Sequence, residues 1–190
     1  MEKECIETYN RLLGQIHAGG ILTESERIWL WNHPIESSRY DDPWILSDLI
    51  PLEPGIPHTV VIQCLTASPL HSIVPTFTIP FEQHGFVKLS GVVGAKMHTA
   101  GMKESKKLSF RMLPGITATA SCVTESGLLM ISYQGWVPDA KPIPLWYETA
   151  ACDRFAMKKK VISENAVQYV CRGADGTEDA FSFCVNWYAD

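Results

Sequence analysis

The sequence predicts a mainly β protein, a single compact β-sandwich or partly closed barrel with an N-terminal amphipathic helix. Three observations predict this class. The 190 residues, 46% of them hydrophobic, suffice for one core and are too few for two ordinary domains. Residues 1–20 have helical periodicity. From residue 27 to residue 188, short runs of β-branched and aromatic residues alternate with clusters of Pro, Gly, Asp and Ser, as is typical of strands and turns.

The predicted N-terminal helix carries its apolar residues at spacings of three and four. These residues form one stripe: Cys5, Tyr9, Leu12, Leu13 and Ile16. Acids at the start suit the positive end of the helix dipole, and Gly19 with Gly20 supplies a left-handed stop. Because Gly14 weakens the helix by about 1 kcal/mol relative to alanine, we expect it to depend on docking against the body of the protein or another surface.

Ten later segments have the composition of strands. They are residues 27–31, 59–65, 74–79, 86–98, 107–112, 116–123, 128–136, 145–149, 166–172 and 180–188. The last alternates apolar and polar residues, which predicts a strand with one apolar face. The turn cluster at 173–178 predicts that it forms a hairpin with the strand before it. The region 32–57 holds five prolines and is predicted to be a packed loop with a short strand.

Composition excludes several classes of function. The 16 Lys and Arg against 21 Asp and Glu give a net charge of −5, which argues against nucleic-acid binding. No apolar run has the length of a transmembrane helix, and the first residues lack the apolar core of a signal peptide, so we expect a cytoplasmic protein. The six cysteines include no Cys-x-x-Cys pair and are predicted to be reduced thiols.

No catalytic or metal motif is found, and we expect no cofactor. The segment 91–96 lacks the Gly-Lys-Ser/Thr ending of a phosphate-binding loop. A set of residues on successive strands or loops could converge at one end of the sandwich: His58, Cys64, His71, His84 and His98. Their spacing is not that of metal ligands, so individual surface or hydrogen-bonded histidines are the simpler interpretation.

Aromatic residues are the most suggestive feature of the composition. Six tryptophans and six tyrosines suit partly solvated sites, such as surfaces that stack on sugars, bind cations or lie at a lipid interface. Trp29 and Trp187 lie in apolar runs and are predicted to be core residues. Three aromatics flank the proline-rich connection 138–144 and are predicted to form an exposed patch: Trp136, Trp146 and Tyr147. The lysines at 158–160 are interpreted as a solvated strand end or a contact with anionic headgroups.

The succession of an amphipathic helix, the strand Phe-Val-Lys-Leu-Ser-Gly-Val-Val-Gly at 86–94 and Lys-Lys-Leu-Ser-Phe-Arg-Met-Leu-Pro at 106–114 resembles the actinoporin-like pore-forming cytolysins and related fungal lectins. That resemblance implies a β-sandwich that binds phosphocholine headgroups or sugars. It also implies that the helix enters a bilayer, with a lipid-facing stripe of Cys5, Ile6, Tyr9, Leu12, Leu13 and Ile16. Residues 115–120 lack the family's aromatic cluster, so no headgroup-binding tyrosine is carried over.

The leading hypothesis is therefore a non-enzymatic, cytolysin-like or lectin-like protein whose partner is a lipid headgroup or a carbohydrate surface, with a second copy of the chain as a further partner. The alternative is an intracellular small-molecule-binding protein or enzyme with a pocket at one end of the β-domain, lined by some of the histidines and Cys64. A third hypothesis is an interaction module with an exposed sheet edge or aromatic patch.

Overall fold

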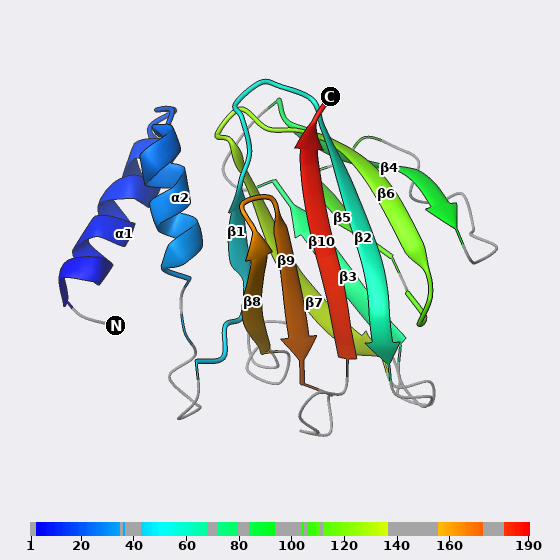
Figure 1. Ribbon diagram of the computed structural model, residues 1–190. Coiled ribbons are helices and arrows are strands. Elements are labelled where there is room, and N and C mark those ends of the chain that lie inside the picture. Colours follow the sequence, from blue (N-terminus) through cyan, green and yellow to red (C-terminus); the bar gives the residue numbers. More distant parts are fainter. Residues whose placement is uncertain are drawn as a thin grey trace.

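Two antiparallel sheets pack face to face, with two helices beside them (Figure 1). The computed structural model describes residues 3–34, 36, 43–67, 72–79, 84–93, 104, 106–110, 112–136, 156–172 and 181–190. The predicted mainly β class and the N-terminal helix are confirmed, and the sheets are not closed into a barrel.

The larger sheet has six strands and the smaller has four. The order in the larger sheet is β4 (Phe86–Val93), β6 (Thr117–Val123), β2 (His58–Ala67), β10 (Phe181–Ala189), β9 (Ala166–Cys171) and β8 (Met157–Ser163). The order in the smaller sheet is β1 (Asp48–Pro51), β7 (Leu128–Trp136), β3 (Ser72–Thr78) and β5 (Lys107–Ser109).

The alternation predicted for the last strand is observed in β10. Phe183, Val185 and Trp187 are each at most 5% exposed and face the space between the sheets, where they meet side chains such as Ile50 of β1. Burial of side chains of this size contributes about 1.5–3 kcal/mol each, so the inner faces are the main source of stability. The strand pairs with β9, as the predicted terminal hairpin requires, and also with β2.

The segment 27–31 is not a strand, and that prediction was wrong. It lies inside helix α2 (Glu24–Asn32), which follows helix α1 (Lys3–His17). Thr23 begins α2 with a capping box, in which its hydroxyl accepts from the Glu26 amide and the Glu26 carboxylate accepts from the Thr23 amide. These reciprocal bonds satisfy N–H groups that the first helical turn leaves free, and they outweigh the β-rich composition of Ile28 to Trp31.

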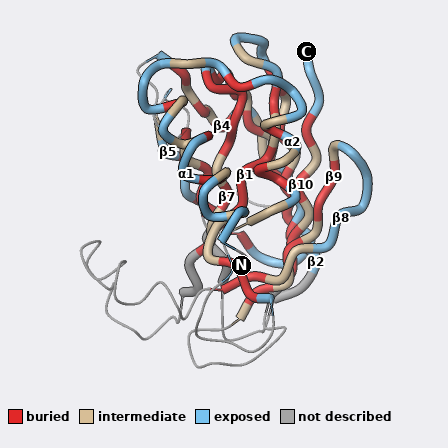
Figure 2. The backbone as a smooth tube through the Cα atoms, turned by 90° about the vertical axis from the view of Figure 1, so that its left-hand side faces the viewer, coloured by how far each residue is buried: buried red, intermediate tan, exposed pale blue. Residues whose placement is uncertain are grey.

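Both helices lie against the outer face of the smaller sheet, as the side view in Figure 2 shows. Along β1, Leu49 packs with the helices while Ile50 points into the core between the sheets. Along β7, Leu128 packs with the helices while Leu129 belongs to the core between the sheets. The smaller sheet is therefore apolar on both faces at these strands, which explains why their sequences do not alternate with polar residues.

Other predicted elements differ in extent. The short strand expected within 32–57 is β1, whereas β8 was not predicted because its Lys-Lys-Lys run has low β-propensity. The strand expected at 107–112 is described as β5 over Lys107–Ser109, and that expected at 86–98 is described as far as Val93. The strand at 145–149 lies outside the described residues. No helix in the described part of the chain is long and apolar enough to cross a membrane.

Candidate functional site

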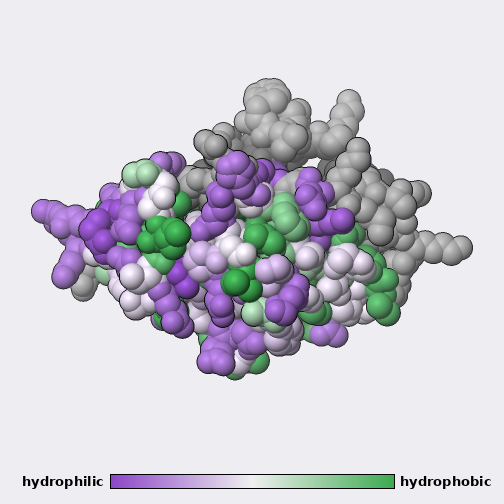
Figure 3. Space-filling view, turned by 90° about the horizontal axis from the view of Figure 1, so that it is seen from above, coloured by the Kyte–Doolittle hydropathy of each residue, from purple (hydrophilic) through white to green (hydrophobic). Residues whose placement is uncertain are grey.

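A groove of about 870 Å³ opens at the end of the molecule where the chain leaves β1 and enters β2. Helix α2 lines it on one side, and the end of β10 and the turn between β8 and β9 line it on the other. Figure 3 looks onto this end, where hydrophilic side chains surround small apolar patches. The volume lies within the range of about 300–1,000 Å³ that is typical of small-ligand sites.

Two tryptophans from distant parts of the chain meet in the lining of the groove. Trp31 comes from α2 and Trp187 from β10, and their rings contact edge to face with centroids 5.6 Å apart. Each side chain is only 5% exposed, so each offers part of its indole to the groove and buries the rest. This edge-to-face geometry is favourable for aromatic pairs and makes the lining rigid.

Lys159 supports Trp31. Its ammonium lies 4.6 Å from the centroid of the Trp31 ring and donates a hydrogen bond to the Trp31 carbonyl oxygen. A cation held over an indole face is attracted by the ring quadrupole, more strongly when it is shielded from water. The lysine on β8 therefore couples the position of α2 to the larger sheet.

The charge of Lys159 is balanced by Asp48, which is fully buried in β1. The ammonium lies 2.9 Å from Oδ2 and 3.0 Å from Oδ1 of the carboxylate. The Tyr169 hydroxyl donates to Oδ2 at 2.7 Å, and the Leu49 amide donates to Oδ1 at 3.0 Å. Three hydrogen bonds and the ion-pair contact at Oδ2 thus compensate the desolvation of this carboxylate.

Burial shifts all three titrating groups of this cluster toward their neutral forms. It raises the pKa of the Asp48 carboxyl above its ordinary value, although the Lys159 charge and the Tyr169 hydrogen bond oppose the shift. It lowers the pKa of Lys159, against the attraction of Asp48. The pKa of Tyr169 is raised well above its ordinary value, first by burial and then by the Asp48 charge. Tyr169 is therefore a neutral donor to Asp48.

Arg27 brings a buried guanidinium to the groove. It is 7% exposed, and its Nη1 donates to the Leu22 carbonyl at 2.6 Å. Its stem lies against Gly127, where a Cβ would come within 2.7 Å of Arg27 Cδ. Burial lowers the pKa of Arg27, and the charges of Glu24 and Glu53 oppose that shift.

Two N–H groups of the lining lack a hydrogen-bond partner. They are Arg27 Nε and Trp31 Nε1, both fully shielded atoms in the described part of the chain. Buried donors are almost always paired in folded proteins, because an unpaired one costs about 1–3 kcal/mol. Arg27 Nε lies beside Gly127, 3.0 Å from the position that a Cβ there would occupy, so this atom is packed against the fold.

Polar residues also line the groove. Glu24, Glu53 and Glu164 are exposed in the lining, and Asn165 is half-buried. Tyr188, which follows Trp187 on β10, is 50% exposed. The groove thus combines aromatic side chains with carboxylates and an amide, a combination that can bind a polyhydroxylated molecule.

His58 lines the groove, but its ring nitrogens already have partners. Nδ1 donates to the Ile56 carbonyl at 2.9 Å, and Nε2 accepts from the Glu53 amide at 3.3 Å. Cys64 lies six residues farther along β2, roughly 20 Å away at the strand repeat. Burial raises its pKa to about 11. The structure does not bring these two residues together, and His58 holds the loop before β2.

Of the other predicted pocket residues, only His84 belongs to the described part of the chain. His84 is exposed and does not line it, and His71 and His98 lie outside the described residues. The predicted aromatic patch cannot be placed as a unit, because Trp146 and Tyr147 lie outside the described residues and only the backbone of Trp136 is described, at the end of β7.

The predicted stripe of α1 is largely covered by protein. Tyr9, Leu12 and Ile16 are at most 9% exposed and pack with Leu30 of α2 and Leu128 of β7. The remaining members differ from these three: Leu13 is half-buried against the same cluster, Cys5 is half-buried and Ile6 is 43% exposed. An ion pair of 3.3 Å between Arg11 and Glu26 joins α1 to α2. In this state the helix is docked through its apolar side.

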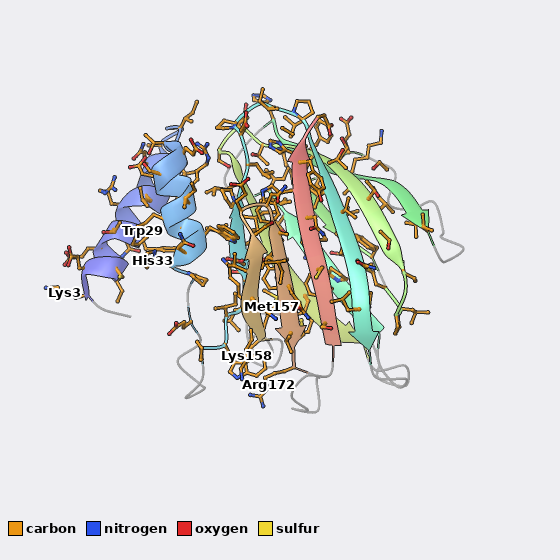
Figure 4. All side chains as sticks on the ribbon, in the orientation of Figure 1. Lys3, Trp29, His33, Met157, Lys158 and Arg172 are labelled. Atoms are coloured by element: carbon orange, nitrogen blue, oxygen red, sulfur yellow. The ribbon has the colours of Figure 1, made fainter. Side chains whose placement is uncertain are left out.

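The lysines at 158–160 do not form one solvated strand end, so that interpretation was wrong. Lys159 is half-buried and forms an ion pair with Asp48, and of the three lysines Lys160 alone is exposed. The ammonium of Lys158 lies 4.5 Å from the centroid of the buried Trp44 ring, with Arg172 5.3 Å from it. Figure 4 places Lys158 and Arg172 at the opposite end of the sandwich from the C-terminus and the groove.

Among the described residues, no three His, Cys, Asp or Glu side chains are grouped so as to hold a metal ion. Comparisons with protein-family models, curated proteins and solved structures found no match to the chain. The resemblance to actinoporin-like proteins therefore stays a prediction.

Sequence reasoning missed Arg27, Trp31, Asp48 and Lys159 as residues of the groove or its support. One signal was present for α2, since Thr23 and Glu26 have the spacing of a capping box. A second signal was Asp48, which is the only acidic residue in the segment 44–50. A carboxylate among apolar residues needs a buried partner. Nothing in the sequence indicated that this partner is Lys159.

Proposed function

We propose that this chain is a non-enzymatic carbohydrate-binding protein and that the groove is its binding site. The observation that carries the proposal is the combination of aromatic and polar side chains in one groove: Trp31, Trp187 and Tyr188 line it together with Glu53, Glu164 and Asn165. A sugar presents C–H faces that pack on aromatic rings and hydroxyl groups that form hydrogen bonds with carboxylates and amides.

The rim supports the same class of ligand. Sugar hydroxyl groups can donate to the carboxylates of Glu53 and Glu164, which are exposed in the lining. Tyr188, at 50% exposure, can pack against a bound ring. A purely apolar ligand would form no hydrogen bond with these carboxylates.

The membrane version of the leading hypothesis has less support. It requires α1 to leave its place on α2 and β7 and expose Leu12 and Ile16, which are 1% and 4% exposed. The enzyme alternative also has less support, because both nitrogens of His58 are occupied and the Cys64 thiol, with a pKa of about 11, is protonated at neutral pH.

The test is binding of the full chain to a glycan array, followed by calorimetric titration with the best-bound oligosaccharide. We expect Tyr188→Ala to weaken binding about tenfold through lost ring contact. Trp31→Phe should also weaken it, because it reduces the aromatic surface of the lining and keeps a ring. Val93→Ala is the control, since Val93 is 73% exposed on β4 and does not line the groove.

Vesicles of phosphatidylcholine, with and without an anionic lipid, provide the opposing arm. Binding to vesicles with no binding to any glycan would overturn the proposal in favour of the membrane version. Glycan binding that Tyr188→Ala and Trp31→Phe leave unchanged would also overturn it, because the groove would then not be the site.

A further inference from the structure

The outer face of the larger sheet carries no charge over its four central strands. Figure 1 shows this face turned toward the viewer, and neither of the two described helices lies in front of it. The central strands β6, β2, β10 and β9 contain no Asp, Glu, Lys or Arg, although 19% of the chain is charged. Exposed protein surface commonly has about 25–35% charged residues. A face without them is instead typical of an interface, whose centre is depleted of charge.

The side chains of this face are short or of medium length, and most are polar. Burial alternates along β6, so that Thr117 and Thr119 point away from the core. One row across the four strands consists of the direct partners Thr117, Gln63, Cys184 and Gln168. Gln63 is exposed and the other three are half-buried. Side chains of this length suit the separation of about 10 Å at which two sheets pack face to face.

The middle of the face can form hydrogen bonds that the chain itself does not use. Gln63 on β2 and Asn186 on β10 lie in adjacent rows, since Asn186 is the direct partner of Val61. Within the described residues, neither side-chain amide has a hydrogen-bond partner. An amide, like a hydroxyl group, both donates and accepts. A face of amides and hydroxyl groups is therefore complementary to a second copy of itself, as a twofold interface requires.

Charged residues lie at the margin of the face. Lys88 is on β4 and Lys160 is on β8, which are the first and last strands of the larger sheet. Protein interfaces have the same arrangement, with a polar rim around a centre that has few charges. A nucleic acid or an anionic bilayer would instead require positive charge at the centre. The distribution of charge thus favours a second copy as the partner.

The area of the face is close to what a stable dimer needs. Six strands at about 4.8 Å and seven residues at about 3.3 Å give a face of roughly 29 Å by 23 Å, or about 670 Å² before the relief of the side chains adds to it. A specific interface of standard size buries about 800 Å² on each partner. Two copies that meet over the whole face therefore approach this size.

We infer that two copies of the chain form a dimer by packing the outer faces of their larger sheets against each other. A twofold axis near Gln63 and Asn186 relates the two copies, so the same residues contribute from both sides and the assembly closes at two. The inference concerns a different surface from the groove and is independent of the proposed carbohydrate binding.

The test is the mass of the full chain in solution, measured by sedimentation equilibrium over a wide range of concentration. We expect the mass to reach twice the 21.2 kDa of one chain. The variant Gln63→Glu/Asn186→Asp keeps the shapes of both side chains and places two negative charges at the centre of each face. Like charges that meet across an interface are costly, so we expect dimerisation to weaken about tenfold or more.

The matched control is Asn10→Asp/Gln15→Glu, which makes the same two changes on α1 and should dimerise like the wild type. Sodium chloride should restore part of the dimerisation of Gln63→Glu/Asn186→Asp, because salt screens the added charges. A chain that stays monomeric at every concentration would overturn the inference, as would a dimer that Gln63→Glu/Asn186→Asp leaves intact. Neither outcome alters the test of glycan binding by the groove.

Discussion

The ammonium of Lys159 and the hydroxyl of Tyr169 meet on the same atom, Oδ2 of Asp48, at 2.9 Å and 2.7 Å. Lys159 and Tyr169 are direct partners across β8 and β9 of the larger sheet, whereas Asp48 belongs to the smaller sheet. One buried carboxylate therefore joins two strands of the opposite sheet, and through Lys159 it also supports Trp31 in the groove.

The first prediction concerns this cluster. Asp48→Leu leaves the Lys159 ammonium buried without its counter-ion, so we expect it to reduce the free energy of unfolding by about 3–5 kcal/mol in a urea titration. The triple variant Asp48→Leu/Lys159→Met/Tyr169→Phe removes every member that the change would leave unpaired. It should recover most of that loss. A triple variant no more stable than Asp48→Leu would show that packing, not charge, determines the effect.

The second prediction is a pH dependence. Lys159→Met removes the charge that opposes the rise in the Asp48 pKa, so that pKa should rise further above its ordinary value of 3.8. A carboxyl whose pKa is higher folded than unfolded adds stability below the unfolded pKa and loses it as the pH rises through the folded pKa. The free energy of unfolding of Lys159→Met should therefore fall further below that of the wild type as the pH rises from 3.8. Lys160→Met, at the exposed neighbour, is the control and should show no such trend.

The third prediction compares two glycines in the left-handed region. Gly127→Ala would place a Cβ 2.7 Å from both Arg27 Cδ and the Leu52 carbonyl oxygen, at a φ of +70°. At Gly115, with φ +79°, nothing lies within 4 Å of the new Cβ. We expect Gly115→Ala to cost about 1–2 kcal/mol from the backbone alone, and Gly127→Ala to cost more and to weaken glycan binding because Arg27 must shift. Equal thermal unfolding midpoints would contradict this account.

The fourth prediction separates a docked α1 from a free one. Leu12 is 1% exposed, so Leu12→Ala should cost about 2–5 kcal/mol in unfolding free energy. Ile6→Ala, at a residue that is 43% exposed on the same helix, should change it by no more than about 0.5 kcal/mol. If α1 spends most of its time away from the sheet, both substitutions will have small effects.

The fifth prediction concerns thiol reactivity. Cys64, Cys122 and Cys171 are at most 1% exposed, and burial raises the pKa of Cys64 to about 11. Cys5 is half-buried near the start of α1. Alkylation followed by peptide mass analysis at pH 8 should modify Cys5 well before the three buried thiols, and unfolding in urea should remove the difference. Early modification of Cys64 would contradict the burial of its strand.

Strands with a clear period of two could be predicted from the sequence because their burial follows the pleat. The alternation in β10 is an example, and its hairpin partner β9 was predicted from the turn cluster between the two strands. Helix α2 was mistaken for a strand because Ile28 to Trp31 have β-rich composition, although the capping pair at Thr23 and Glu26 fixes the helix.

The groove could not be predicted because it depends on where distant segments meet. Trp187 was predicted to be a core residue and is 5% exposed, yet it also lines the groove because α2 brings Trp31 against it. In the same way, Lys159 within a lysine run is indistinguishable from a solvated residue until β1 places Asp48 opposite it. His58 is a hydrogen-bonded histidine that holds the loop before β2, which agrees with the simpler of the two interpretations of the histidines.

The position of β10 has a consequence for folding. It comes after the other described strands in the chain, yet it lies between β2 and β9 in the larger sheet. Its partner β2 begins more than a hundred residues earlier, so this pairing must close a long loop before it gains any stability, which slows folding. During synthesis, the edge of β2 that pairs with β10 stays unpaired until β10 has left the ribosome. In that interval the unpaired edge can associate with other chains.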